Sequence, residues 1–232
     1  MDVTQERAPF GAYGKIPALG DFFQLSLPRS FVAPWDDWLQ ETLTRARSAL
    51  GPRWQDCYLT APVWRFTLSA GLAGPASVVG VLMPSVDTVG RLFPLTLAAP
   101  LGGAAPAALH GAWEGFDRLE TLARAMLEEG ATKAALAHGL AGVTLPGPVR
   151  APLRSAATGM RLVRAPGVTS GLCALGAAEF CAGFAAPSVW STATEDGARH
   201  LAADGLPGPQ AAAALFDPAA ELWPGTPAGA AP

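Results

Sequence analysis

Seven residues in three parts of the chain combine side chains capable of chemistry with neighbours that favour loops. They are Lys15, Asp21, Trp64, Arg65, Ser85, Asp87 and Arg91. Glycine, proline or an aromatic residue flanks the charged members, so each is predicted to lie in a loop or at a strand end. We treat the seven as a candidate surface for a partner or a ligand, and we predict no catalytic residue.

Two interpretations of this set stay open. Ser85 and Asp87 lie two positions apart, so on a strand their side chains would share a face and would support acid–base chemistry. Alternatively, Asp21 and Asp87 cap turns, and Arg65 and Arg91 pair with them. We favour the turn interpretation, because such ion pairs are common and no histidine lies nearby in sequence to serve as a base.

The signatures of common enzymes, cofactor sites and metal sites are absent from the sequence. Gly14-Lys15 resembles the end of a phosphate-binding loop, but Pro9 and Ile16 occupy the positions that require glycine and serine or threonine. The three histidines are isolated from one another and from the cysteines, unlike zinc ligands. Ser85 lacks the flanking glycines of a nucleophile elbow. We therefore expect no cofactor, no metal and no enzymatic activity.

Composition narrows the class of protein. Of the 232 residues, 50% are hydrophobic and 15% are charged, which predicts a packed globular fold. The net charge is -3 and no basic stripe is present, so nucleic acid is not expected as a partner. No secretory signal opens the chain, no apolar run reaches the ~18 residues of a membrane span, and three unpatterned cysteines suit reduced thiols. We expect a cytoplasmic protein without direct membrane insertion.

Helical and strand patterns succeed one another along the chain. The clearest helix spans 28–50, with Ser30 as its predicted N-cap and Gly51 at its end. Further helices are predicted over 106–129 and 131–141.

Three strands joined by tight turns are predicted at 63–70, 77–83 and 92–98, which implies an antiparallel meander. The later segments follow in this order: a loop at 146–154, a strand at 172–175, a helix at 177–185 and a strand at 189–192. The pattern as a whole predicts an α+β fold, a single domain in which helices flank both faces of a mostly antiparallel sheet. The domain is expected over 10–222, between a short polar lead at 1–9 and a disordered tail rich in proline, glycine and alanine at 223–232.

An ordered series of glycine, tryptophan and proline positions fills residues 10–100. It opens with Gly-Ala-Tyr-Gly-Lys-Ile-Pro-Ala-Leu-Gly-Asp-Phe at 11–22, continues through Trp-Arg-Phe at 64–66, and includes Met-Pro-Ser-Val-Asp at 83–87. This series resembles the TagF/ImpM family of proteins associated with bacterial type VI secretion.

The rest of the chain resembles that family only loosely. Pro-Ser-Val-Trp-Ser-Thr at 187–192 is similar to a later family strand, and Gly-Leu-Pro at 205–207 to another family segment. Two positions depart from the family pattern. Leu25 stands where the family usually carries arginine, and Ser191 replaces a tryptophan.

The resemblance implies a regulatory function. Members of the family act as post-translational repressors of type VI secretion, and some bind the forkhead-associated scaffold protein of the apparatus. Others are fused to a serine/threonine phosphatase module, for which 232 residues leave no room. Any dephosphorylation is therefore expected from a separate phosphatase.

Two alternatives to repression remain. The chain would instead be a structural accessory component of the apparatus, which predicts stoichiometric co-purification with it. Or it would be a small-ligand-binding or enzymatic domain that uses Lys15, Asp21, Ser85, Asp87 and Arg91. The second alternative requires Lys15, Asp87 and Arg91 to lie within about 10 Å of one another.

Overall fold

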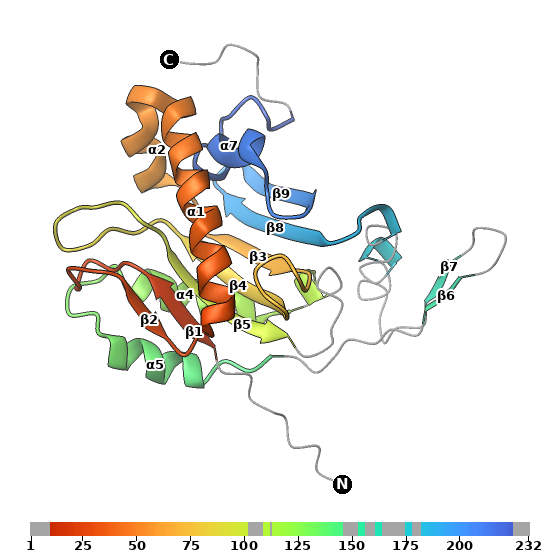
Figure 1. Ribbon diagram of the computed structural model, residues 1–232, viewed down its shortest axis with the longest axis horizontal. Helices are drawn as coiled ribbons and strands as arrows, with labels where there is room; N and C mark the ends of the chain where they lie inside the picture. The colour runs from red at the N-terminus through yellow and green to blue at the C-terminus, as the bar shows by residue number, and fades with distance from the viewer. Residues whose placement is uncertain are drawn as a thin grey trace, which may run out of the picture.

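A seven-stranded antiparallel sheet forms the middle layer of the computed structural model (Figure 1). The structure describes residues 10–101, 109–111, 113–145, 153–155, 161–163, 175–177 and 182–224. The strands, in spatial order, are β2 (Phe23–Leu25), β1 (Gly11–Gly14), β5 (Leu95–Leu101), β4 (Ser77–Met83), β3 (Trp64–Leu68), β8 (Pro187–Thr194) and β9 (Gly197–Asp204). Every neighbouring pair is antiparallel.

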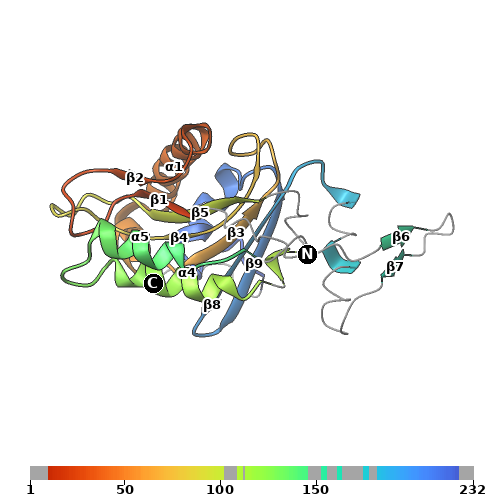
Figure 2. The ribbon, with the colours of Figure 1, turned by 90° about the horizontal axis from the view of Figure 1, so that it is seen from below.

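Helices cover both faces of this sheet. Helix α1 (Arg29–Leu50) lies on one face, and α4 (Gly115–Ala125) with α5 (Lys133–Ala141) lies on the other, as Figure 2 shows. The predicted α+β fold with a mostly antiparallel sheet between helices is confirmed.

The predicted meander is also confirmed, since β3, β4 and β5 are neighbours joined in chain order. Strand β4 has the predicted bounds, whereas β5 begins three residues later than predicted. Residues 78–83 of β4 are buried without alternation, because helices cover both faces of the sheet there. The prediction missed β1, β2 and β9. The first two have only four and three residues, and β9 is rich in alanine, which is uncommon in strands.

Helix α1 confirms the strongest helical pattern in the sequence. It ends as predicted at Gly51, whose φ of 53° is left-handed and whose N–H donates to the Arg47 carbonyl. The predicted N-cap is wrong. The N-cap is Pro28, no side chain caps the helix, and Ser30 lies inside the first turn. The chain then continues through η1 (Gly51–Arg53) into a short helix, α2 (Trp54–Thr60).

Large aromatic residues fill the core between α1 and the sheet. Trp35 stacks on Trp190 of β8 with ring centroids 6.1 Å apart, and both contact Phe66 of β3. All three side chains are fully buried. A short helix, α7 (Ala212–Phe216), follows η2 (Pro209–Ala211) and packs on α1 and α2. This core therefore joins the first hundred residues to the last forty.

A second core lies between the other face of the sheet and α4 with α5. The predicted helix over 106–129 is shorter than expected, because α4 ends at Ala125, while α5 begins at Lys133, two residues later than predicted. The apolar stripe of that helix is buried as predicted, from Leu109 through Phe116 to Met126.

Other predictions for the second half have mixed outcomes. The predicted loop at 146–154 is wrong at its end, because β6 (Leu153–Ser155) pairs with β7 (Arg161–Val163). Leu175 starts a helical turn rather than ending a strand. Trp223, the first residue of the predicted tail at 223–232, is buried and stacks on Trp64. Residues 172–174, part of the predicted helix at 177–185, the lead at 1–9 and the tail from 225 onward lie outside the described residues.

Candidate functional site

Two loops meet at one end of the sheet, which we call the loop end. The first loop, residues 15–22, joins β1 to β2, and the second, residues 84–94, joins β4 to β5. Because β1 and β4 both run antiparallel to β5, the last residues of both strands lie at the same end of the sheet. A hydrogen bond of 3.2 Å from the Thr88 N–H to the Leu19 carbonyl joins the two loops.

The second loop is a tight turn organised around Asp87. The Asp87 N–H donates to the Arg91 carbonyl at 3.2 Å, and the Gly90 N–H donates to the Asp87 carbonyl at 2.9 Å. Gly90 has a φ of 81°, a left-handed conformation that suits glycine. The Asp87 Oδ1 accepts from the backbone amides of Val89 and Arg91, at 3.1 and 2.9 Å. The predicted turn-capping function of Asp87 is confirmed.

The Asp87 carboxylate also pairs with two cationic side chains. Lys15 Nζ donates to the Asp87 Oδ2 at 2.9 Å, and Arg91 Nε donates to the same oxygen at 2.6 Å. Arg91 Nη2 also donates to the Gly20 carbonyl at 2.6 Å. The Asp87 side chain is fully buried, and that of Lys15 is 6% exposed. The Lys15–Asp87–Arg91 network thus binds the two loops to each other.

This network keeps Asp87 ionised. Burial by itself raises the pKa of the Asp87 carboxyl, but the Arg91 amide, the Lys15 and Arg91 side chains and the Val89 amide together hold it well below its usual value of 3.8. Hydrogen bonds to the charged form outweigh the cost of burial here. The carboxylate therefore has neither a proton to give nor a free oxygen with which to take one.

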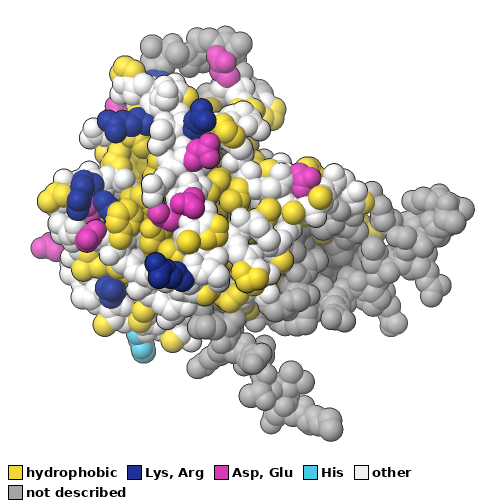
Figure 3. Space-filling model, viewed as in Figure 1, with side chains coloured by type: hydrophobic (Ala, Val, Ile, Leu, Met, Phe, Trp, Pro, Cys, Tyr) yellow, Lys and Arg dark blue, Asp and Glu magenta, His cyan; other side chains and the backbone are white. Residues whose placement is uncertain are grey.

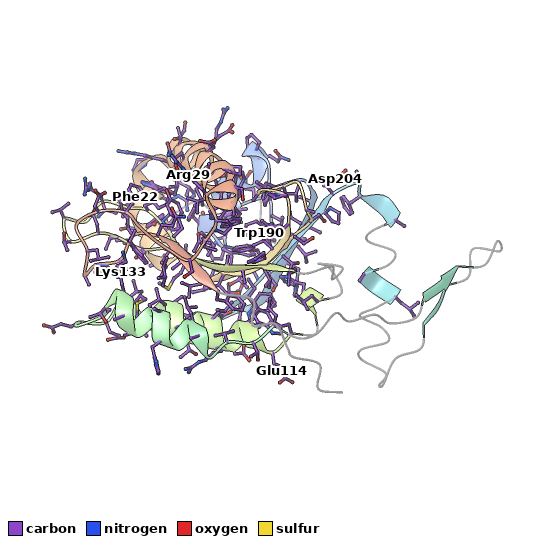
Figure 4. All side chains as sticks on the ribbon, turned by 60° about the horizontal axis from the view of Figure 1, so that its bottom comes forward. Phe22, Arg29, Glu114, Lys133, Trp190 and Asp204 are labelled. Atoms are coloured by element: carbon purple, nitrogen blue, oxygen red, sulfur yellow. The ribbon has the colours of Figure 1, made fainter. Side chains whose placement is uncertain are left out.

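An aromatic group caps the network on its outer side. Lys15 Nζ lies 4.7 Å from the centroid of the Phe22 ring, which packs edge-on against Phe93, also at 4.7 Å. Tyr13 contacts both rings, stacked on Phe22 and edge-on to Phe93. Figure 4 shows Phe22 at the outside of the molecule, away from the buried Trp190. The Asp21 Oδ1 accepts from the Phe22 N–H at 2.7 Å and so fixes the backbone there.

The loop end displays apolar side chains to solvent. Phe22 is 45% exposed and Val89 is 74% exposed, one from each loop. Asp21 and Arg91 are exposed beside them. Elsewhere on the surface, charges of both signs are interspersed, as Figure 3 shows for the face that carries α1.

Ser85 lies just inside this turn and away from its surface. It is 3% exposed, and its backbone is tied to Tyr58, whose hydroxyl donates to the Ser85 carbonyl at 2.8 Å and accepts from its N–H at 3.1 Å. The Ser85 Oγ has no hydrogen-bond partner among the described residues. Ser85 and Asp87 thus do not present a shared reactive pair to solvent.

Trp64 and Arg65 lie apart from the network. Trp64 is 3% exposed, and its indole N–H donates to the Leu215 carbonyl at 2.7 Å. Arg65 projects from the opposite face of the sheet and pairs with Glu120 and Asp117 of α4, at 2.5 and 2.6 Å. The predicted pairing of Arg65 with a loop aspartate is therefore wrong. The structure brings Lys15, Asp21, Asp87 and Arg91 together at the loop end, with Ser85 beneath them. Trp64 and Arg65 lie elsewhere.

A second polar group, missed by sequence reasoning, lies on the α4 side of the sheet. We call it the His110 group. The His110 Nδ1 lies 3.2 Å from the Thr67 Oγ1, and its Nε2 lies 2.8 Å from the Ser191 Oγ. Burial first, then the nearby His200 and Arg65, lower the pKa of His110 to about 3. Ser191, the residue that departs from the family's tryptophan, is thus the partner of a partly buried, neutral imidazole.

The described residues hold no group of three or more His, Cys, Asp or Glu side chains placed to bind a metal. A search of the same residues for a helix long and apolar enough to cross a membrane finds none. A large open groove, of about 1460 Å³, lies near the β8–β9 turn and Trp223 rather than at the network.

Comparisons with known proteins agree with this fold. The family model described as the TagF N-terminal domain, type VI secretion system-associated, matches residues 11–143. Among solved structures, PA0076 from Pseudomonas aeruginosa PAO1 is similar, with 35% sequence identity and a TM-score of 0.77 over 94% of this chain and 98% of that one. No curated protein matches the chain. The family match ends at 143, so the domain end at 222 stays a prediction. The chain belongs to the TagF N-terminal domain family of proteins associated with type VI secretion.

Proposed function

We propose that this protein is a non-catalytic, post-translational repressor of type VI secretion that acts in the cytoplasm by binding another protein. The forkhead-associated scaffold of the apparatus is the proposed partner. The observation that carries the proposal is the loop end, where an ion network centred on the buried Asp87 fixes two loops and leaves Phe22 and Val89 exposed. A rigid surface of this kind loses little conformational entropy on binding.

The chemistry of the network favours binding over catalysis. A general base needs a free oxygen and a pKa near the working pH. Asp87 has a strongly lowered pKa, and both of its oxygens accept two hydrogen bonds. The hydroxyl of Ser85 is buried beneath the turn. These features support a structural function for the network and a binding function for the surface above it.

The surface has the composition of a protein interface. Aromatic residues and arginine are enriched at such interfaces, and Phe22 and Arg91 supply one of each. Val89 adds apolar area from the second loop, and Asp21 adds a charge at the margin. Phe22 and Val89 are therefore proposed as the apolar anchors of the contact.

Secretion and binding assays test the proposal with one matched pair of variants. Val89→Ser removes an apolar side chain from the loop end, whereas Leu59→Ser removes one that is 53% exposed on α2. Val89→Ser should weaken binding to the purified scaffold by about tenfold or more and should release secretion of the tube protein from repression. Leu59→Ser should leave both unchanged. Equal effects of the two variants, or no affinity for the scaffold, would contradict the proposal.

Deletion and overproduction separate repression from the alternatives. A repressor predicts more tube-protein secretion on deletion and less on overproduction. A structural accessory component predicts lost secretion on deletion and stoichiometric co-purification with the apparatus. If a separate serine/threonine phosphatase takes part, adding that phosphatase should lower the phosphorylation of the scaffold. Adding this protein alone should leave the phosphorylation unchanged.

A further inference from the structure

We propose that the outer edge of β9 is a dimer interface, at which β9 pairs antiparallel with β9 of a second copy of this chain. This inference is independent of the proposed function, because it concerns the edge of the sheet formed by β9 and not the loop end.

Strand β9 is long and is paired on one side only. All eight of its residues pair with β8. Among the described residues, no backbone hydrogen bond reaches the other side of β9. The opposite edge of the sheet is β2, which has three residues. A row of unpaired backbone N–H and C=O groups is complementary to another extended strand.

The register shows which groups face outward. The Ser69 N–H donates to the Pro187 carbonyl, so Pro187 and every second residue after it direct their backbone groups to the β3 side. The Gly205 N–H donates to the Ala186 carbonyl, so Gly205 points toward β8. Alternation along the strand then leaves four residues of β9 with outward backbone groups: Ala198, His200, Ala202 and Asp204.

This set of four is complementary to itself about Leu201. In an antiparallel pair centred on Leu201, Ala198 lies opposite Asp204 of the second copy, and His200 lies opposite its Ala202. Each of the four residues then exchanges hydrogen bonds, which gives about eight between the two strands. The same patch serves both copies, as a two-fold interface requires.

The side chains favour a second copy over an unrelated peptide. Ala198 and Ala202 are small and exposed, so the approaching backbone meets no bulk. The basic side chains, Arg199 and His200, lie toward the start of the strand, and the acidic Asp204 lies at its end. Antiparallel pairing therefore places each His200 diagonal to the other copy's Asp204, whose Oδ1 accepts from the Ala186 N–H at 2.7 Å and whose Oδ2 is the oxygen within reach of that histidine.

The mass of the full chain in solution tests the proposal directly. At about 100 µM, light scattering after size exclusion should give twice the monomer mass. Ala202→Pro removes one outward N–H from each strand without removing a bond to β8, and it should raise the dissociation constant about 100-fold. Ala202→Ser keeps that N–H and should leave the dimer intact. A monomeric wild-type chain, or a dimer that Ala202→Pro does not weaken, would overturn the proposal.

A crosslink tests the register. Only a residue on the two-fold axis lies opposite its own copy, and Cα atoms of such a non-hydrogen-bonded pair lie about 4.5 Å apart, within disulfide reach. Leu201→Cys should form a covalent dimer on mild oxidation at a rate well above that of the wild-type chain. Ala198→Cys should not, because it faces Asp204 of the second copy. The reverse result would refute pairing about Leu201.

Discussion

The protein stabilises two polar groups, each centred on a side chain largely removed from water, in opposite ways. The Lys15–Asp87–Arg91 network buries the charges of Lys15 and Asp87 and pairs Asp87 with the exposed Arg91 as well, at N–O distances of 2.9 Å or less. The His110 group is held by two hydroxyls, from Thr67 and Ser191, and stays uncharged. One site selects the ionised form of its central side chain, and the other selects the neutral form.

The difference follows from the neighbours of each central residue. Asp87 has two cations and two backbone amides aimed at its oxygens, which outweigh the cost of burying its charge. His110 is partly buried near Arg65 and His200, and no acidic side chain among the described residues is hydrogen-bonded to its ring, so a proton on the ring would be both desolvated and repelled. Pairing rather than burial alone thus decides which protonation state is stable.

Removing the centre of the charged network should give the largest effect. Asp87→Ala leaves the nearly buried Lys15 ammonium without a counter-charge and frees the amides that organise the second loop. We expect the melting temperature to fall by about 10 °C, measured by circular dichroism or differential scanning fluorimetry.

Asp21→Ala is the matched control for this variant. Asp21 belongs to the same end but is exposed, and its hydrogen bond goes to the adjacent amide. Its loss should lower the melting temperature by less than about 2 °C. Adding Lys15→Met to Asp87→Ala should recover part of the loss, because no unpaired charge then remains buried. Equal shifts for the two aspartates would show that the network does not stabilise the loops.

The His110 group should make the free energy of unfolding depend on pH. The pKa of His110 is lowered from 6.5 to about 3 on folding, so between these values the unfolded chain binds a proton that the folded chain excludes. Stability is therefore full above pH 6.5 and falls as the pH drops toward 3. From pH 7.5 to 5.0 the loss should be about 2 kcal/mol in the free energy of unfolding, measured in urea.

His110→Gln should remove this dependence, since glutamine does not titrate and still offers hydrogen bonds. Asp87 does not contribute in the same range. Its lowered pKa adds stability above about 3.8, which is lost only at still lower pH. A wild-type chain and a His110→Gln variant with parallel pH profiles between 7.5 and 5.0 would contradict the neutral-histidine assignment.

A smaller effect is expected from Ser191→Ala. This change leaves the His110 Nε2 without its hydroxyl partner, 2.8 Å away, but unpairs no charge. The free energy of unfolding should fall by about 1 kcal/mol, as for a typical lost hydrogen bond. Thr194→Ala is a control in the same strand, because its hydroxyl bonds only within the exposed β8–β9 turn. A larger loss for Thr194→Ala would show that Ser191 does not stabilise His110.

The sequence predicted the network better than the His110 group, for a physical reason. Asp87 and Arg91 are four residues apart in one turn, and glycine and proline mark that turn, so local chemistry indicated their pairing. Lys15 joins them across 72 positions, which only the strand order explains. Thr67, His110 and Ser191 come from three separate segments and share no local signal.

The same distinction applies to the fold. Helix α1 and strands β3 and β4 carry strong periodic patterns and were predicted. Strands β1 and β2 are too short to show a period, and they form because β5 and β1 offer them an edge. Arg65 was expected beside a loop aspartate, but alternation along β3 directs it to α4 on the other face. Tertiary pairing, not propensity, decides these positions.

The smallest effect on stability is expected at the outer surface of the loop end. Val89 is 74% exposed, and its side chain is not among the groups that bind Asp87, which uses only the Val89 amide. Val89→Ser should therefore change the free energy of unfolding by less than about 0.5 kcal/mol in urea titrations. Phe22→Ser should cost more, because it loses the contacts with Lys15 and Phe93. If Val89→Ser destabilised the fold as much as Phe22→Ser, the division between a stabilising network and a displayed surface would be wrong.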